Sequence, residues 1–376
     1  MLIVAHYGEI AIKGKNKRKF EELLLKNIRR ACGKGCTAKI KESRILIDAH
    51  GKGALDAVGT VFGIEAYAEA VETRPDLEAI WDTVSKMGTL LRRKRIRVDT
   101  KRADKQFPIK SPQVNAEIGK RIVEGFGCGV DLENPDVTVH IEIGRKNAYV
   151  YTGRRKGLGG LPVGSSGKVL CLFSGGIDSP TAAWMMMKRG CEVDFLHVHP
   201  FEKSSNAKGT KIEKLVHSLN RFQGPSELLL APYSEFYKRS FEIGRGYELV
   251  VFRRFLYLLA EKIAKEKKYL GIVSGDSLGQ VASQTLHNIA ATQCGLSVPI
   301  FRPLIGLDKN EIIAVSRKAG LLELSLEKYK DCCSLVAVQH PATRAKGEKV
   351  EKMLGEMEGG KAIEETIKKL KILKVS

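Results

Sequence analysis

The chain has 376 residues, 43% of them hydrophobic and 28% charged, and its formal net charge is +20 at pH 7. This length and composition exclude a disordered chain and indicate two or three domains with hydrophobic cores. The positive charge favours an anionic partner, first of all a nucleic acid, with a merely solubilising surface as the alternative.

The first predicted region, residues 1–53, has the pattern of a small α+β unit. Residues 2–4 and 38–47 read as strands, and residues 20–31 have the periodicity of an amphipathic helix. The loop at residues 13–19 holds five basic residues in seven, and its glycine lets the backbone approach a phosphate chain. The candidate RNA contacts in this loop are Lys13, Lys15, Lys17 and Arg18.

The second predicted region, residues 54–156, is also α+β and is rich in basic residues. Helices are expected over 77–91 and 114–124, and strands over 93–102, 137–144 and 147–153. Basic residues beside an exposed aromatic suit a phosphate backbone with a stacked base. The candidates are Arg93, Arg95, Lys101, Arg102, Lys105 and Phe107. The alternative is a solvated basic face with Phe107 in the core.

A glycine-rich segment, residues 157–168, follows and is expected to be a mobile linker. In the third region, residues 169–346, apolar strands alternate with helical patterns, which predicts a parallel sheet wrapped by helices. The last residues, 347–376, read as an amphipathic helical tail.

A phosphate-binding loop is expected at the start of the third region, where the string SGGIDS occupies residues 174–179 after an apolar strand. Paired glycines let backbone N–H groups close on phosphate oxygens, and the following helix start adds partial positive charge. Asp178 is a candidate ligand for a magnesium ion bridging the phosphates. The string resembles the PP-loop of the ATP pyrophosphatases, and it fits neither a Walker A loop nor a dinucleotide fingerprint.

Two later strand ends are expected to complete the nucleotide pocket. One carries His197 and Val198, although a strand-end histidine taken alone is more often a satisfied structural residue. The other carries residues 274–277, with Gln280 and Gln284 one turn apart on the following helix. The carboxyl ends of parallel strands share one edge of a sheet, which favours nucleotide contact by these groups.

The whole sequence resembles the tRNA 4-thiouridine synthetases. The similar segments include HYGEIAIKGKNKRKFEELL, KRADKQFPIKSPQVN, YVYTGRRKGLGGLPVGSSGKVLCLFSGGIDSP, GDSLGQVASQTLHNI and FRPLIGLDKNEI, in the order found in that family. The resemblance implies an α/β PP-loop catalytic domain preceded by α+β ferredoxin-like and THUMP domains. It also implies ATP contacts from Leu172, Phe173, Ser174, Gly175, Gly176, Asp178, Ser179, His197, Val198, Arg253, Gly275 and Gln284.

The resemblance further implies a reaction. Uridine at tRNA position eight would be adenylated by ATP, and sulfur carried as a persulfide on Cys332 or Cys333 would replace its oxygen. The expected cofactors are ATP and Mg²⁺, the partners are tRNA and either a cysteine desulfurase or free sulfide, and the protein would be a homodimer. Two alternatives stay open: another PP-loop enzyme that modifies a different tRNA base, and a non-catalytic THUMP protein that only binds RNA.

The eight cysteines and the apolar pattern bound these expectations further. Some members of the resembled family hold an iron–sulfur cluster through a CxxC pair, which this sequence lacks, so a cluster would need dispersed residues such as Cys294, Cys332 and Cys333. Other members append a rhodanese-like domain, for which this chain is too short. Without a signal-peptide pattern or about 18 consecutive apolar residues, we expect a cytoplasmic protein with no membrane span.

Overall fold

The computed structural model describes residues 1–51, 53–200, 209–329, 332, 336 and 341–376. It divides into two compact units, Met1–Pro162 and Val163–Ser376. Each unit is built around its own β-sheets and is described by itself, and together they confirm the expected α/β catalytic region preceded by α+β regions.

The first sheet lies in unit 1 and has five strands in the order β10-β4-β1-β3-β2. The strands are Arg155–Lys156 (β10), Ile64–Glu69 (β4), Leu2–Tyr7 (β1), Arg44–Asp48 (β3) and Thr37–Lys41 (β2). Helices α1 (Lys17–Cys32) and α2 (Ala54–Gly59) pack against it around a core that includes Ile3, Leu24 and Ile45. The sheet extends past the expected boundary at residue 53, because β4 pairs with β1 and brings α2 with it.

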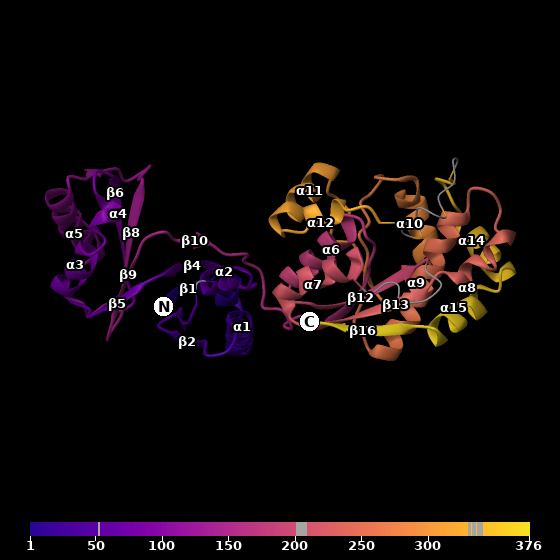
Figure 1. Ribbon diagram of the computed structural model, residues 1–376, viewed down its shortest axis with the longest axis horizontal. Helices are drawn as coiled ribbons and strands as arrows, with labels where there is room; N and C mark the ends of the chain where they lie inside the picture. The colour runs from indigo at the N-terminus through magenta and orange to yellow at the C-terminus, as the bar shows by residue number, and fades with distance from the viewer. Residues whose placement is uncertain (52, 201–208, 330–331, 333–335, 337–340) are drawn as a thin grey trace. The chain divides into compact units, whose positions relative to one another are not determined.

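The second sheet, also in unit 1, has the order β5-β9-β8-β6-β7. Its strands are Val71–Thr73 (β5), Ala148–Tyr151 (β9), Val137–Ile143 (β8), Arg95–Arg102 (β6) and Gly129–Val130 (β7). Helices α3 (Leu77–Ser85), α4 (Gly88–Leu91) and α5 (Ser111–Phe126) lie along one face in Figure 1. The expected single helix over residues 77–91 is therefore wrong: it is interrupted between α3 and α4, where Gly88 starts the second helix against the ring of Phe126.

A buried charge joins the two sheets of unit 1. Glu142 on β8 is 4% exposed and accepts hydrogen bonds from Tyr151 (2.6 Å) and the ring of His6 on β1 (2.7 Å). Its second oxygen lies 3.0 Å from Nε of Arg44 on β3. Burial opposes the charge of Glu142, but these partners outweigh it and lower its pKa to about 2.

The third sheet lies in unit 2 and has six strands in the order β15-β14-β11-β12-β13-β16. The first five are parallel: Ile300–Phe301 (β15), Ile272–Val273 (β14), Lys168–Leu172 (β11), Glu192–His199 (β12) and Ser226–Pro232 (β13). Figure 1 shows α6 (Asp178–Lys188) and α7 (Lys211–Gln223) on one face, with α11 (Lys309–Lys318) and α12 (Leu322–Leu326) outside them. Helix α9 (Glu248–Lys267) covers the other face and carries much of the core, including Phe252 and Phe255.

The last strand corrects the expected all-helical tail. After α14 (Gly347–Glu356) and α15 (Gly359–Lys368), residues Lys371–Val375 form β16, which pairs antiparallel with β13. The segment is only five residues long, and the helical periodicity of the residues before it dominates the sequence pattern. The prediction of helices before it holds, but the chain ends as an edge strand of the catalytic sheet.

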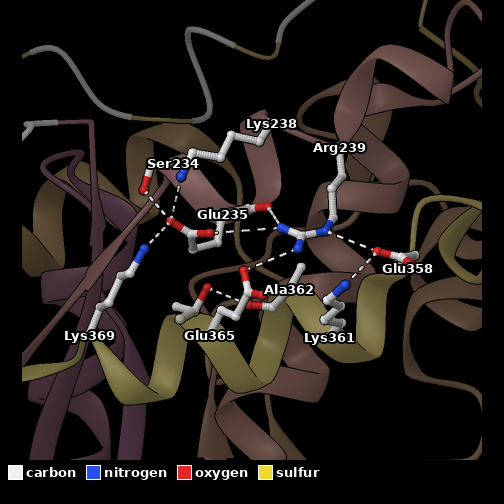
Figure 2. A network of polar contacts seen from close by, with 10 residues as sticks. Ser234, Glu235, Lys238, Arg239, Glu358, Lys361, Ala362, Glu365 and Lys369 are labelled. Carbon is white, nitrogen blue, oxygen red and sulfur yellow. Dashed lines mark hydrogen bonds and ion pairs between the residues drawn. The ribbon is translucent and has the colours of Figure 1, made fainter.

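A polar network ties α15 to α8 (Ser234–Tyr237), as Figure 2 shows. Glu235 is 2% exposed and accepts hydrogen bonds from Lys369 (2.7 Å), Lys238 (3.2 Å) and Ser234 (3.0 Å). The bond from Lys369 is the largest of the effects that lower the pKa of Glu235 to about 2. Arg239 extends the network to Glu365 at 3.1 Å, so the C-terminal helix is held by charge as well as by packing.

One further expectation is wrong for a local reason, and the ends of the glycine-rich segment are held within their own units. Residues 38–47 form a hairpin of β2 and β3 rather than one strand, because Glu42 and Ser43 turn the backbone at positive φ. The glycine-rich segment expected to be mobile is hydrogen-bonded: Gly159 bonds to Ile64 and Gly63, and Gly164 and Ser166 donate to the carbonyl of Gly190. A Cβ on Gly157 would overlap the carbonyl oxygen of Ile64, so close packing accounts for that glycine.

Candidate active site

The SGGIDS loop connects β11 to α6 and is closed by its own serines. The backbone N–H of Ser174 donates to Oγ of Ser179 at 2.8 Å, and that hydroxyl lies 3.1 Å from the carbonyl oxygen of Ser174. Helix α6 begins at Asp178, so its first N–H groups and its dipole face the loop. This is the arrangement that binds a phosphate at a helix N-terminus.

A second loop, after β14, approaches the phosphate loop so closely that only glycine fits. A Cβ on Gly275 would lie 2.8 Å from the backbone nitrogen of Ser179 and 2.9 Å from the carbonyl carbon of Asp178. The contact places Ser274 and Asp276 beside the start of α6. It thus brings together two strand ends that lie about 100 residues apart in the sequence.

A cavity of about 620 Å³ opens at this edge of the sheet, within the volume range of small-molecule sites. All but one of the residues expected to contact ATP line it: Leu172, Phe173, Ser174, Gly176, Asp178, Ser179, His197, Val198, Arg253, Gly275 and Gln284. Gly175 lies in the loop but not among the lining residues. Leu249, Phe252 and Leu256 of α9 supply an apolar wall.

Asp178 is already bound by two side chains that sequence reasoning did not assign to it. Lys309, the first residue of α11, lies with Nζ 2.8 Å from Oδ1, and Gln280 donates to Oδ2 at 2.9 Å. Mg²⁺ bound with a nucleotide usually takes one or two carboxylates and completes its shell with phosphates and water. Asp178 suits such an ion as a single carboxylate at the phosphate loop, in exchange for its contact with Lys309.

Asp276 forms a second charged cluster, deeper in the cavity. It is 1% exposed and lies 2.5 Å from Nη2 of Arg253 and 3.2 Å from Nε of Arg302. The hydroxyl of Tyr257 also donates to it, at 2.8 Å. Burial opposes the charge, but Arg253 outweighs it and the pKa of Asp276 falls to about 2. Arg253, expected to touch ATP, is therefore oriented by a buried carboxylate.

His197 lies at the end of β12 with hydrogen bonds at both ring nitrogens. Nδ1 lies 2.8 Å from the carbonyl oxygen of Phe173, and Nε2 lies 2.8 Å from the hydroxyl of Tyr329. A nucleotide would thus meet the face of this ring rather than its nitrogens. Gln284 lines the cavity too, but from the short helix η5 (Ala282–Gln284), before α10 (Leu286–Gln293), so the expectation that Gln280 and Gln284 share one helix is wrong.

Cys332 lines the same cavity and is 3% exposed, with its Sγ 3.3 Å from the carbonyl oxygen of Val198. Cys333, the other candidate sulfur carrier, lies outside the described residues. Cys294 is exposed. Within the described ranges, no three His, Cys, Asp or Glu side chains gather as a metal site, so the structure adds no support for an iron–sulfur cluster.

Lys309, Arg302 and Tyr329 are the site residues that sequence reasoning missed. Lys309 follows Asp308, whose side chain accepts from two backbone N–H groups at the start of α11. This capping pattern is the local sequence signal that a helix begins there. Asp276 stood in the strand-end string that we assigned to the pocket as a whole. Nothing in the local sequence indicates that Tyr329 reaches His197.

The RNA-contact candidates of unit 1 are placed differently from one another. Lys15, Arg93, Lys101 and Lys105 are exposed. Several others are engaged within the protein: Lys13 lies over the ring of Phe20, Lys17 lies 3.6 Å from Glu21, Arg18 binds Glu22 at 2.9 Å, and Arg95 binds Asp131 and Asp136 at 3.0 Å.

The loop at residues 103–110 is held down from within. Arg102 donates to the carbonyl oxygens of Phe107 and Ile109, at 2.9 and 2.8 Å, and Phe107 packs half-buried against the core of the second sheet. This placement favours the packing interpretation of Phe107 over base stacking. Arg102 has the geometry of a loop anchor.

The described part of the chain contains no helix that is long and apolar enough to cross a bilayer.

Family comparison divides the chain as the sheets do. Residues 164–358 match the family described as "Thiamine biosynthesis protein (ThiI)", residues 76–152 match the THUMP domain, and residues 2–68 match the ThiI ferredoxin-like domain.

Relatives of similar length carry one name. A "Probable tRNA sulfurtransferase" of Methanocaldococcus jannaschii is 39% identical over 94% of this chain and 96% of its own. One of Caldanaerobacter subterraneus subsp. tengcongensis is 38% identical over 93% of each chain. A crystal structure of a 4-thiouridine synthetase–RNA complex with bound ATP is 30% identical, with a TM-score of 0.89 over 100% of this chain and 99% of that one. The chain belongs to the ThiI family of tRNA sulfurtransferases, with ferredoxin-like and THUMP domains before the catalytic domain.

Proposed function

We propose that this protein uses ATP to transfer sulfur to a uridine of tRNA, forming 4-thiouridine. The observation that carries the proposal is the presence of Cys332 and the SGGIDS loop in one cavity at the carboxyl edge of the sheet. A nucleotide loop alone suits many ligases, and a buried cysteine alone is commonly inert packing. Their proximity suits a reaction in which one group activates an oxygen and the other delivers sulfur.

In the first step, the uridine O4 attacks the α-phosphorus of ATP, and pyrophosphate leaves. The N–H groups at the start of α6 and the ammonium of Lys309 are placed to stabilise the charge on the phosphates. A magnesium ion held by Asp178 and the phosphates would supply further charge neutralisation there. Arg253 and Arg302, fixed by Asp276, keep positive charge at the deeper end of the cavity.

In the second step, the terminal sulfur of a cysteine persulfide attacks C4 of the adenylated base, and AMP leaves with the former O4. The new sulfur is then joined to the cysteine by an S–S bond. A second thiolate, either Cys333 or an external dithiol, attacks the cysteine sulfur and releases the thiolated base. The disulfide left on the protein is reduced by external thiol before the next turnover.

Unit 1 is proposed to hold the tRNA, with residues 1–69 and the strand at 155–156 forming its ferredoxin-like part and residues 71–151 its THUMP part. The exposed basic residues of both parts suit phosphate contacts, and the 4-thiouridine synthetase of similar fold was crystallised with RNA. A cysteine desulfurase, which hands on persulfide sulfur, is the proposed sulfur source. Free sulfide is the alternative: it would attack C4 of the adenylated base directly and displace AMP, with no persulfide formed, because a thiol and sulfide give a persulfide only with an oxidant. A homodimer is the proposed assembly.

The test is a reaction of the purified protein with unmodified tRNA, ATP, Mg²⁺ and sulfide, followed by nucleoside mass spectrometry. Wild type is expected to form 4-thiouridine, and Cys332→Ala and Cys333→Ala to show which thiol carries sulfur when a desulfurase and cysteine replace sulfide. If AMP is released in a tRNA-dependent reaction but neither donor gives 4-thiouridine, the protein would instead modify a different base.

A further inference from the structure

The segment that carries Cys332 is fastened to two adjacent residues of β12. The hydroxyl of Tyr329 lies 2.8 Å from Nε2 of His197, and Sγ of Cys332 lies 3.3 Å from the carbonyl oxygen of Val198. His197 is itself buried at the cavity wall. Two successive residues of one strand end therefore fix two points, three residues apart, on the cysteine segment.

The direction of the Tyr329 bond follows from the other nitrogen of the ring. Nδ1 faces the carbonyl oxygen of Phe173 at 2.8 Å and must donate to it, because a carbonyl oxygen only accepts. The neutral ring then has a lone pair at Nε2, which accepts from the Tyr329 hydroxyl. Removing that hydroxyl deletes one donor to a buried acceptor.

The aromatic ring of Tyr329 also lies on the phosphate loop. A Cβ built on Gly175 would lie 2.9 Å from Cδ1 of Tyr329, so the ring packs directly against this glycine. The same side chain thus contacts the phosphate loop through its ring and the strand end through its hydroxyl.

The chain segment just before Tyr329 is held by Lys211, at the start of α7. This lysine is 7% exposed and donates to the carbonyl oxygens of Ser325 and Glu327, at 2.7 and 2.6 Å. The chain therefore leaves α12 along a defined path before it reaches Tyr329. A side chain anchored in this way can set the place of a cysteine three residues later.

We propose that Tyr329 is a positioning residue that holds the Cys332 sulfur in the nucleotide cavity through its hydrogen bond to His197. Its importance for catalysis rests on the proposed function, since it concerns the delivery of sulfur and not the activation of the base. Replacing Tyr329 by Phe keeps the ring on Gly175 and deletes only the hydroxyl. The variant should release Cys332 while leaving the phosphate loop in place.

The experiment follows alkylation of Cys332 by iodoacetamide in the full-length protein, with tandem mass spectrometry separating it from Cys333. Tyr329→Phe is expected to raise the Cys332 rate about threefold to tenfold, the range that one hydrogen bond supplies. Tyr269→Phe is the matched control, because it removes another buried tyrosine hydroxyl, bonded to Asp194 at 2.6 Å in the same unit. Alkylation of buried Cys171 reports general unfolding in every sample.

A double variant, Tyr329→Phe with His197→Leu, distinguishes action through His197 from a separate effect. If the hydroxyl acts through the ring nitrogen, the Cys332 rate in the double variant matches that of His197→Leu alone. In turnover, Tyr329→Phe should form less 4-thiouridine per pyrophosphate released than wild type does, because pyrophosphate leaves in the first step, before sulfur is delivered. A Cys332 rate unchanged from wild type, or raised equally by Tyr269→Phe, would overturn the proposal whether or not thiouridine is formed.

Discussion

The two units of this protein use charge in opposite ways. In unit 2, the carboxylates at the cavity are partnered at close range: Asp276 with two arginines and Asp178 with Lys309 and Gln280. In unit 1, four of the basic residues that suit RNA, Lys15, Arg93, Lys101 and Lys105, are exposed at the surface. A deeply buried charge of unit 1, Glu142, instead joins two sheets through Arg44 and His6.

The difference follows from the two tasks. A site for phosphoryl chemistry gains from charges fixed in a dry cavity, where they cost no reorganisation during reaction. A surface for a long polyanion needs many weak contacts that release counterions, and each can be exposed. Substitutions in unit 2 should therefore have large, specific effects, and those on the unit 1 surface small effects that depend on salt.

The largest effect is expected from Asp276→Asn. The change leaves Arg253 and Arg302 without their shared counter-charge inside the cavity, and breaking such a pair costs about 3–5 kcal/mol. Unit 2 should unfold at lower urea concentration while unit 1 is unchanged. Tryptophan fluorescence separates them, because Trp184 lies in unit 2 and Trp81 in unit 1, so each unit is followed in a variant that lacks the other tryptophan. Equal loss in both units would remove the contrast drawn above.

Asp178→Asn should cost activity rather than stability, because the residue lies at the open edge of the cavity. We expect the rate of tRNA-dependent AMP release to fall about 10²–10³-fold, the range for losing one preorganised electrostatic group. Lys309→Met should fall in the same range, and the urea midpoint of unit 2 should stay close to wild type in both. A matching loss of stability would show that the Lys309–Asp178 pair is structural.

The buried charge of unit 1 should be visible as a pH dependence of stability. The pKa of Glu142 is about 2 in the fold, below its value of about 4.3 in an unfolded chain. Its contribution, on the order of 2–3 kcal/mol, is therefore complete above about pH 4.3 and is lost as the pH falls toward 2. Urea unfolding of the Trp184→Phe protein, followed through Trp81, should lose less stability between pH 6 and pH 3 when Glu142→Gln is added.

The smallest effects are expected from single surface lysines. Lys15→Ala and Lys105→Ala should each weaken binding of unmodified tRNA severalfold at low salt and reduce the slope of log Kd against log salt by about one. Fluorescence anisotropy between 50 and 200 mM salt measures both. Arg18→Ala is the matched control, since its guanidinium is already bound to Glu22 and should change the slope less. An equal change in all three would show that local ion pairs do not limit RNA contact.

The sequence could predict the fold and the phosphate loop because both depend on local pattern. An apolar strand, paired glycines and a helix start lie within a dozen residues, and alternating strands and helices place later strand ends at the same edge. The candidate sulfur carriers Cys332 and Cys333 could be named only through the family resemblance, because no spacing rule selects them.

Contacts between distant segments could not be predicted. Lys309 reaches Asp178 across 131 residues and Tyr329 reaches His197 across 132, and neither pair has a local signature. Composition also does not show that a particular glycine is packed, as Gly157 is against the backbone carbonyl of Ile64. The terminal strand was missed because its pairing partner β13 lies some 140 residues earlier.

That terminal strand affects how the protein can be made. Because Val375 pairs with Ser226 and its carbonyl accepts a bond from Asn220, the catalytic sheet lacks an edge strand until residue 375 has been translated. Unit 1 contains all of its own strands by residue 156 and can fold while the ribosome is still at work. During synthesis, the nascent chain would therefore present an RNA-binding surface before it has a working nucleotide pocket, and unfinished chains would expose the edge of β13 to aggregation.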